Sequence, residues 1–340
     1  MRVVRSLSLD IHLNLAIENN LFLDSPEGER CLFLWRNSRS VVIGRYQNPW
    51  LECALGALRD DGVVLARRQS GGGAVWHDEG NLCFTFMGPR AGFSRDDNIA
   101  LVAAALRDLG ADASVNDRRD IMVGGRKVSG SAYREAAGRA FHHGTLLVEA
   151  DLHALSRYLK SSVPLLSSRG VKSVRSPVAN IRDTAPDADA AAIRAAIARR
   201  WAPGAAVESV GEEEAMENAG IAAFRARSAS RDWVLGSSPP FVRLLEFEIE
   251  ADAGKRETIA LEAHVEGGRI AQAKPARDGV GSAPGRVTAE AAEALRGADY
   301  ENTAMAAAAG GRAKQALERG DEPLARALES LARAAASIDL

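Results

Sequence analysis

The stretch "RRQSGGGAVWHD" (residues 67–78) holds three consecutive glycines between a pair of arginines and a His-Asp pair. The apolar runs on either side of the glycines, "GVVLARR" (62–68) and "GNLCFTFMG" (80–88), predict strands. We therefore expect the glycines to form a strand-to-strand loop. Such a loop can adopt positive φ and expose successive amide N–H groups, which suits a phosphate, a carboxylate or a narrow acyl chain. A flexible hairpin tip is the alternative.

The glycine stretch does not match the common phosphate-binding loops. The spacing G-x-x-x-x-G-K-[ST] is absent, and no G-x-G-x-x-G opens a helix here. A nucleotide site in this chain would therefore require a different fold.

Further elements are expected on both sides of this stretch. Strands are predicted at 31–37, 40–44, 120–124, 126–135 and 139–149, and helices at 96–110, 151–160 and 187–201. Residues 161–183 mix Ser, Gly, Pro and basic residues without a clear period, which predicts a long, mobile loop. The sequence Gly-Ser-Ser-Pro-Pro within residues 230–241 marks a boundary. Beyond it, three strand-like runs precede helices near 288–297 and 312–337.

Composition restricts the classes of function. The 340 residues carry 43 basic and 45 acidic side chains, a formal charge of -2, which argues against nucleic-acid or anionic-membrane binding as the main role. No apolar run of about 18 residues is present for a membrane span. The N-terminal sequence does not resemble a signal peptide, so we expect a cytoplasmic protein, or a mitochondrial one in a eukaryote. Cys31, Cys53 and Cys83 form no C-x-x-C pair and are expected to be buried free thiols.

Lys127 is the first candidate for catalysis. It lies in "DIMVGGRKVSGSAYRE" (120–135), just before the small residues 129–131, which leave room for a substrate beside a compact cation. A lysine there can bridge a carboxylate and a phosphate and stabilise charge that develops in acyl-phosphate chemistry. A solvated strand lysine is the alternative. Asp120 could hold Mg²⁺, which prefers one or two carboxylates together with phosphate oxygens.

His142 and His143 are adjacent in "FHHGTLL" (141–147). Neighbouring residues on a strand face opposite sides, so at most one of the two points into a given site. We expect one histidine to be structural and no zinc site.

Several motifs, in one order, resemble the lipoate-protein ligases, which share a fold group with the biotin ligases and octanoyltransferases. They are "WRNSRSVVIGRYQNPW", "ARRQSGGGAVWHDEGNLCFTF", "GRKVSGSAYRE", "RAFHHGTLL" and "KSVRSPVANI". The resemblance covers the first 183 residues and, more loosely, the C-terminal region. It implies an α+β fold with a large mixed β-sheet and flanking helices in a catalytic domain at 1–240. A small α+β accessory domain at 241–340 follows.

The resemblance also implies a two-step reaction. Lipoate and MgATP, both substrates, give lipoyl-AMP and pyrophosphate, and the lipoyl group then passes to a lysine of a lipoyl domain. The expected acceptors are the E2 subunits of 2-oxoacid dehydrogenases and the glycine cleavage H protein. No tightly bound cofactor is expected, and a monomer is the default.

Site residues follow from the same resemblance. Lys127 is the catalytic residue and contacts both the lipoyl carboxylate and the α-phosphate. ATP and the adenylate are expected to contact Arg68, Gly73, Ala74, Val75, Trp76, Asp120, Lys127, Lys172 and Arg175. Lipoate is expected to contact Ser70, Gly71, Gly72, Gly73, His77, Lys127, His143 and Thr145. Asp120 is the expected Mg²⁺ ligand.

Three residues depart from the family pattern. Arg119 stands where an asparagine is usual before Asp120, which weakens the case for the metal site. Pro177 replaces a basic residue in the loop over the adenylate, and Trp76 replaces a phenylalanine or tyrosine.

Three alternatives differ in chemistry. A lipoyltransferase would use preformed lipoyl-AMP. An octanoyltransferase would need a nucleophilic cysteine in the pocket, and none of the cysteines lies in "GRKVSGSAY" or "FHHGT". A non-enzymatic binder or repressor would need a DNA-binding extension, and the N-terminus offers no helix-turn-helix pattern.

Overall fold

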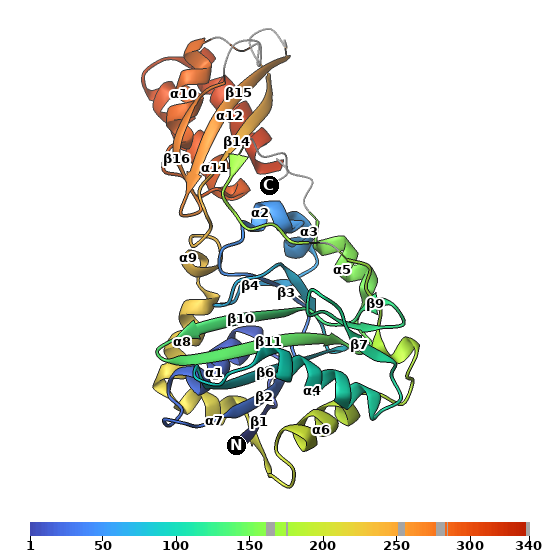
Figure 1. The fold of residues 1–340 in the computed structure, drawn as a ribbon. Coiled ribbons are helices and arrows are strands. Elements are labelled where there is room, and N and C mark those ends of the chain that lie inside the picture. The colour runs from blue at the N-terminus through green and yellow to red at the C-terminus, as the bar shows by residue number, and fades with distance from the viewer. Residues whose placement is uncertain (161–166, 175, 251–255, 277–282, 284, 338–340) are drawn as a thin grey trace. The chain divides into compact units, whose positions relative to one another are not determined.

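A computed structural model describes the chain except at residues 161–166, 175, 251–255, 277–282, 284 and 338–340 (Figure 1). The chain forms two compact units. Unit 1 comprises 1–47, 52–160 and 172–234, and unit 2 comprises 48–51, 161–171 and 235–340. Unit 2 thus includes two short segments from the first half of the chain. The domain division at 240/241 stays a prediction.

Unit 1 is built on a six-stranded sheet with the order β10-β11-β6-β2-β1-β13. Its strands are β1 (Arg2–Ser6), β2 (Cys31–Trp35), β6 (Asn81–Pro89), β10 (Ser131–Ala136), β11 (Arg139–Leu147) and β13 (Val207–Val210). β1 pairs in parallel with β2 and β13, whereas the other pairings are antiparallel. The expected mixed sheet in an α+β fold is therefore confirmed.

Helices cover both faces of this sheet (Figure 1). On one face, α4 (Arg95–Arg107) and α6 (Ala190–Trp201) bury a core that contains Val3 and Leu34. On the other face, α1 (Ile11–Leu23), α7 (Glu212–Glu217) and α8 (Ala219–Ala229) pack on a core that contains Val4 and Trp35. Because side chains alternate along a strand, the central strands β1, β2, β6 and β11 each contribute to both cores.

The stretch 67–78 joins two strands of a smaller sheet with the order β4-β3-β5. The strands are β3 (Ser40–Ile43), β4 (Val64–Arg67) and β5 (Val75–His77), with α3 (Leu55–Asp60) and α5 (Leu152–Tyr158) nearby. The glycines do lie in a strand-to-strand loop. The loop is followed by β5, which lies inside the quoted stretch, and not directly by the strand predicted over 80–88. This additional strand forms because Val75 and Trp76 pair with Val42 and Val41 of β3.

A third sheet holds the segment around Lys127. It consists of β7 (Ala113–Val115), β8 (Ile121–Val123) and β9 (Arg126–Lys127). The strand predicted at 126–135 is therefore wrong as a single element. Its backbone leaves β9 after Lys127, bonds at Gly130 to Thr145, and pairs with β11 from Ser131 onward.

The loop predicted at 161–183 falls partly outside the described residues, namely at 161–166 and 175. Its described part contains β12 (Ser167–Ser168) and a 3₁₀ turn at Ile181–Asp183. Its mobility stays a prediction.

In unit 2, an antiparallel sheet with the order β12-β14-β15-β16 packs against helices. The strands of this sheet after β12 are β14 (Phe241–Glu250), β15 (Arg256–Glu266) and β16 (Arg269–Pro275), and the helices are α10 (Gly285–Leu295), α11 (Asn302–Glu318) and α12 (Glu322–Ser337). The short helix α2 (Pro49–Glu52) straddles the unit division, and α9 (Arg231–Val234) ends unit 1. The single helix predicted at 312–337 is wrong. Gly320, at φ 76°, ends α11 in the left-handed conformation that terminates helices.

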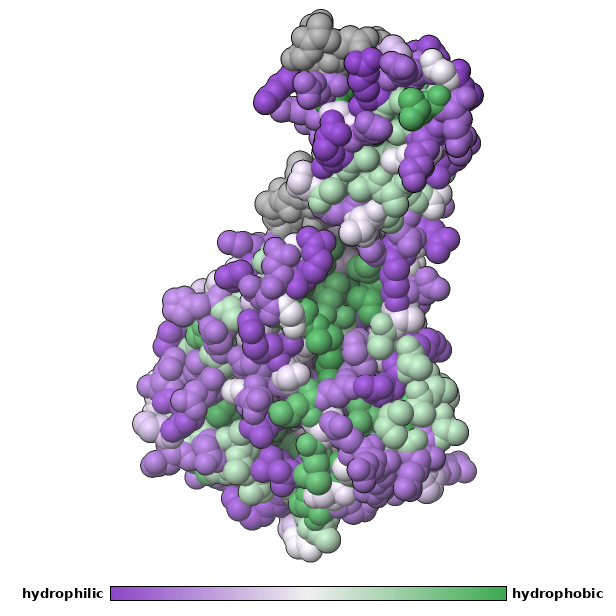
Figure 2. Space-filling view, turned by 180° about the vertical axis from the view of Figure 1, so that it is seen from behind, coloured by the Kyte–Doolittle hydropathy of each residue, from purple (hydrophilic) through white to green (hydrophobic). Residues whose placement is uncertain are grey.

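No helix in the described part of the chain is both long and apolar enough to cross a bilayer. Hydrophilic side chains cover most of the face seen in Figure 2, while hydrophobic residues gather in smaller groups.

Candidate active site

The glycine loop is packed closely by the chain's own backbone. Gly72 has φ 88°, a conformation that favours glycine. A Cβ at Gly44 would collide with the carbonyl oxygen of Gly72, and a Cβ at Gly73 would lie 2.9 Å from Ser173 Oγ. A Cβ at Gly71 would meet no atom within 4 Å. Glycine is therefore favoured at the second position of the run by its φ, and at the third position by the close approach of Ser173.

Buried Arg68 holds this loop, and its buried neighbour Arg67 holds the adjacent residues 44–47. Arg68 Nη2 donates to the carbonyls of Gly71 and Gly73, both at 2.7 Å, and its Nε donates to Ser70. Arg67 donates to backbone carbonyls that include Gln47 at 2.7 Å. Burial lowers the pKa of each arginine to about 10, so both remain charged at neutral pH. Arg68, predicted to contact ATP, thus organises the loop carbonyls.

Ser173 closes over the end of the glycine loop. Its Oγ accepts from the amide N–H of Ala74 and from Gln47 Nε2, both at 3.0 Å. Its own amide donates to the Glu52 carboxylate. The segment after 172 therefore lies directly on the glycine loop.

A buried hydrogen-bond chain runs from the loop into the core. His143 Nε2 lies 2.7 Å from Ser70 Oγ, and its Nδ1 lies 2.8 Å from Glu18 Oε1. The same Glu18 oxygen accepts from Thr85 Oγ1 at 2.7 Å, and Thr85 Oγ1 accepts from Trp35 Nε1. Glu18, on α1, was missed by the sequence reasoning, because a lone glutamate in an apolar segment carries no motif.

His77 is buried close to this chain of bonds. Its Nδ1 lies 2.7 Å from the Asn37 side-chain amide. Burial, together with the positive charge of Arg68, lowers the pKa of His77 to about 3. His77 is therefore neutral in the working pH range, and an uncharged ring suits an apolar ligand.

All three cysteines are free and buried, as expected from the sequence. The structure brings Cys83 to the wall of the site, with its Sγ 3.9 Å from His77 Nδ1. Burial raises the pKa of the Cys83 thiol well above its usual range, so the thiolate form is disfavoured.

His142, next to His143, faces the opposite side of the sheet, where its ring meets Phe84 edge-on. Neither ring nitrogen of His142 has a hydrogen-bond partner among the described residues. The two histidines therefore serve different surroundings, as the strand alternation predicts.

Lys127 forms an ion pair with Asp120, with its Nζ 2.7 Å from Asp120 Oδ1. The two side chains are 19% and 12% exposed, so solvent still reaches them. Arg119, the departure from the family pattern, adopts φ 62° and turns outward to pair with Asp96. Asp120 therefore keeps its place beside Lys127, and the described residues contain no cluster of three or more metal-ligating side chains. A single carboxylate remains compatible with Mg²⁺ held mainly by phosphate oxygens.

The same covering segment reaches Lys127. The Lys127 amide donates to Pro177 O, and Ala179 N–H donates to Lys127 O, both at 3.1 Å. A Cβ at Gly130 would lie 3.6 Å from Thr145 Oγ1 and 3.7 Å from Val75 Cγ1. The strands that carry the predicted residues thus converge at Gly130, with Ser173 bonded to the glycine loop and with Pro177 and Ala179 bonded to Lys127.

The contacts described above do not include the side chains of three predicted residues, Lys172, Arg175 and Trp76. Lys172 is exposed, and Arg175 lies outside the described residues. The Trp76 side chain points away from the glycine loop, because it packs on Tyr158 and donates to Asp78. Only its backbone, on edge strand β5, remains available for the predicted contact.

Comparisons with known proteins agree with this geometry. Residues 10–202 match the model of the family "lipoyl protein ligase A/B catalytic domain". A structure of LipL1 from P. falciparum in complex with lipoate is 24% identical, with a TM-score of 0.61 over 94% of this chain and 98% of that one, a likeness of fold. An archaeal bipartite lipoate-protein ligase from Thermoplasma acidophilum is 27% identical, with a TM-score of 0.58 over 69% of this chain and 96% of that one.

A structure of lipoate-protein ligase A bound with ATP is also 27% identical, with a TM-score of 0.57 over 69% of this chain and 98% of that one. The family match spans more than half of the chain and includes Glu18, the glycine loop, Lys127 and His143. The chain therefore belongs to the lipoyl protein ligase A/B family and is an enzyme of the lipoate-protein ligase type.

Proposed function

We propose that this enzyme activates lipoate with MgATP to lipoyl-AMP, with release of pyrophosphate, and then transfers the lipoyl group to the ε-amine of a lysine on a lipoyl domain. The observations that carry the proposal are the bond of Ser173 to the glycine loop and the bonds of Pro177 and Ala179 to the backbone of Lys127. Acyl group and α-phosphate would meet between these two points.

The ion pair of Lys127 supports a role in the first step. Asp120 holds the ammonium group in a partly buried position, which restricts the conformations of the Lys127 side chain and so favours its approach to the reacting groups. When the lipoyl carboxylate attacks the α-phosphorus, negative charge grows on the phosphoryl oxygens, and Lys127 would stabilise it. Asp120 would orient Lys127 and hold Mg²⁺ beside the phosphates. In this proposal, the ion supplies charge neutralisation for the departing pyrophosphate.

The other end of the site supports an acyl ligand. A pocket beside the loop is lined mostly by polar and charged side chains, among them Arg68, Glu18 and Arg134, and also by apolar Leu15, Phe141 and Phe224. The apolar side chains suit the hydrocarbon chain of lipoate, and the arginines suit its carboxylate. Lipoate would also contact Ser70–Gly73, neutral His77, His143 and Thr145, and the adenylate would contact the backbone at 73–76.

The cysteines favour the ligase over an octanoyltransferase. That reaction needs a thiolate nucleophile, whereas burial raises the pKa of Cys83 and Cys31, the latter to about 12. Lys172 and Arg175 are proposed to offset phosphate charge during the cycle. We also propose a cytoplasmic monomer, or a mitochondrial one in a eukaryote, that acts on E2 lipoyl domains and the glycine cleavage H protein. An archaeal ligase of similar structure is described with its E2 lipoyl domain, which supports this class of acceptor.

Pyrophosphate release from ATP, with lipoate and without acceptor, tests the proposal. We expect lipoate-dependent release, followed by acceptor lipoylation when a lipoyl domain is added. Transfer from supplied lipoyl-AMP without pyrophosphate release would identify a lipoyltransferase instead. Transfer of octanoyl groups from a carrier protein without ATP would identify an octanoyltransferase.

A further inference from the structure

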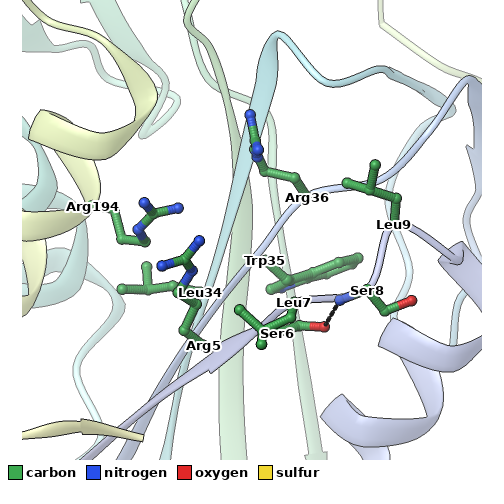
Figure 3. Close-up of a pocket in the computed structure, with 9 residues that line it drawn as sticks. All are labelled: Arg5, Ser6, Leu7, Ser8, Leu9, Leu34, Trp35, Arg36 and Arg194. Atoms are coloured by element: carbon green, nitrogen blue, oxygen red, sulfur yellow. Dashed lines mark hydrogen bonds between the residues drawn. The ribbon is translucent and has the colours of Figure 1, made fainter. Parts of the chain in front are cut away.

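A second polar pocket lies in unit 1 at the carboxyl ends of the parallel strands β1 and β2, next to α6 (Figure 3). Arg5 follows β1 residues Val3 and Val4, Arg36 directly follows β2, and Arg194 extends from α6. The side chains of Arg5 and Arg194 lie close together in Figure 3, and Ser6 and Ser8 complete the polar wall. Neither Asp nor Glu lines the pocket.

This pocket is separate from the site around Ser70 and His143. Arg5 alternates with Val4 and so lies on the sheet face of Val3, which is the face that α6 covers. The Ser70–His143–Glu18 chain of bonds lies on the α1 face. The Arg5 side chain and the Ser70–His143–Glu18 chain therefore lie on opposite faces of the sheet, while Trp35, which also lines the pocket, bonds to Thr85 on the α1 face.

None of the three arginines forms an ion pair with another residue that the structure describes. Arg5 Nε is buried and has no hydrogen-bond partner there. Arg36 Nη1 donates to the carbonyl of Glu79 and not to a carboxylate. Burial and the nearby charges of Arg5 and Arg36 lower the pKa of Arg194.

Two carboxylates lie near the pocket and each accepts a hydrogen bond, that of Glu212 coming from Ser8, which lines the pocket itself. Asp189 acts mainly as the N-cap of α6, where it accepts from the Ala192 amide at 2.7 Å. Glu212 accepts the Ser8 hydroxyl at 2.6 Å. The like charges of the arginines therefore repel one another in the free protein, and such an arrangement costs stability unless an anion offsets it.

We propose that the pocket formed by Arg5, Arg36, Arg194 and Ser6 binds a phosphate-type oxyanion, either inorganic phosphate or pyrophosphate. Guanidinium groups present paired N–H donors in a fork that matches phosphoryl oxygens. Arg5 and Arg194, from a strand end and a helix, lie close together at a recess, whereas Arg36 lines the same pocket with its guanidinium group directed away from them (Figure 3). Such a recess suits a small free anion better than a folded acidic partner.

Isothermal titration of the full chain with inorganic phosphate, and separately with pyrophosphate, at constant ionic strength tests the proposal. The variants are Arg5→Gln and Arg194→Gln, and the matched control is Arg199→Gln, an exposed arginine on the same helix. We expect one site whose affinity falls by roughly tenfold or more in each variant, the effect of losing a charged hydrogen bond. Affinity should be unchanged in the control and in Lys127→Ala, which marks the other site. The relative affinities of the two anions identify the natural source.

A melting experiment without added anion provides an independent readout. Because Arg194 is repelled by its neighbours, Arg194→Gln should melt at the same temperature as the wild type or higher. Phosphate should then raise the melting temperature of the wild type more than that of the variant. Because Arg194 is only partly buried, Arg194→Gln is expected to fold, and it keeps the test valid if Arg5→Gln does not fold.

The proposal is overturned by equal phosphate binding in wild type and both variants, or by binding that disappears only in Lys127→Ala. It is also overturned if the variants raise the KM for a lipoyl-domain acceptor while phosphate binding is unchanged, because the arginines would then contact a protein. These outcomes are independent of the proposed ligase reaction, since anion binding requires no turnover.

Discussion

Replacement of Glu18 tests the buried chain of bonds that supports the glycine loop. The Glu18 side chain is 4% exposed and accepts two hydrogen bonds, at 2.8 Å from His143 and 2.7 Å from Thr85. Glu18→Ala would leave both donors buried without a partner and open a cavity beside them. Glu18→Gln keeps the volume and one acceptor oxygen, so it separates the loss of the carboxylate from the loss of packing.

The expected magnitude follows from these contacts. Two unpartnered buried donors and a cavity should destabilise the fold by about 3–5 kcal/mol in Glu18→Ala, and Glu18→Gln by about 1–2 kcal/mol. For a unit of this size, the melting temperature falls by about 2–4 °C per kcal/mol, so Glu18→Ala should melt about 6–20 °C lower. His143 would then no longer hold Ser70, and the KM for lipoate should rise by roughly tenfold.

Tryptophan fluorescence is a suitable assay, because four of the five tryptophans, at 35, 76, 201 and 233, belong to unit 1. Glu27→Ala, at an exposed position just after α1, is the matched control. A Glu18→Ala protein that melts with the control and keeps its KM for lipoate would refute the reasoning.

Three further predictions concern the same site. Gly72→Ala should raise the KM for lipoate and lower the free energy of unfolding by about 1–2 kcal/mol, because φ 88° strains an alanine. Gly71→Ala should match the wild type in both measurements, because its Cβ meets no atom within 4 Å. Equal kinetics in the two variants would contradict this prediction. Cys83→Ala should retain lipoylation within about threefold, since a protonated thiol is no nucleophile, and loss of activity in a stable variant would instead implicate the cysteine. The pKa of His77 is about 3 in the folded state and near 6.5 in the unfolded state. Between these pH values the unfolded state binds more protons than the folded state. The free energy of unfolding therefore falls as the pH falls from about 6.5 to about 3. Denaturant melts of His77→Gln between pH 7 and 4 should show a shallower decline than those of the wild type, and an unchanged slope would exclude this contribution.

Several strands near the site could be predicted from the sequence, because glycine runs and alternating apolar residues are local signals, whereas the mixed α+β fold was implied by the motif resemblance. The strand-to-strand position of the glycine loop followed from its flanks. The break of the strand after Lys127 could not be predicted, since it depends on bonds from Gly130 to Thr145, a residue of another strand. Similarly, Gly320 ends α11 within a run whose apolar pattern continues into α12.

For some site residues, a motif predicts the position in the chain but not the contacts that the side chain makes. Motif resemblance placed Arg68 at the nucleotide, yet its guanidinium group is occupied by carbonyls of the loop. Glu18 and Ser173 were missed, because each acts through a partner distant in sequence, His143 and Ala74 respectively. Such pairings arise from tertiary packing and carry no signal in either segment alone.

Formation of lipoyl-AMP by Lys127→Ala in a single turnover, measured against Lys160→Ala, tests the central claim most directly. Lys160 is an exposed lysine in unit 1, so its removal controls for loss of charge alone. Loss of a cation from the developing charge should slow adenylate formation by roughly 10²–10³-fold in Lys127→Ala, with the melting temperature close to that of the wild type, while Lys160→Ala forms lipoyl-AMP at the wild-type rate. Equal rates of lipoyl-AMP formation in the two variants would contradict the assignment of the acyl-adenylate site to Lys127 and the segment that covers it.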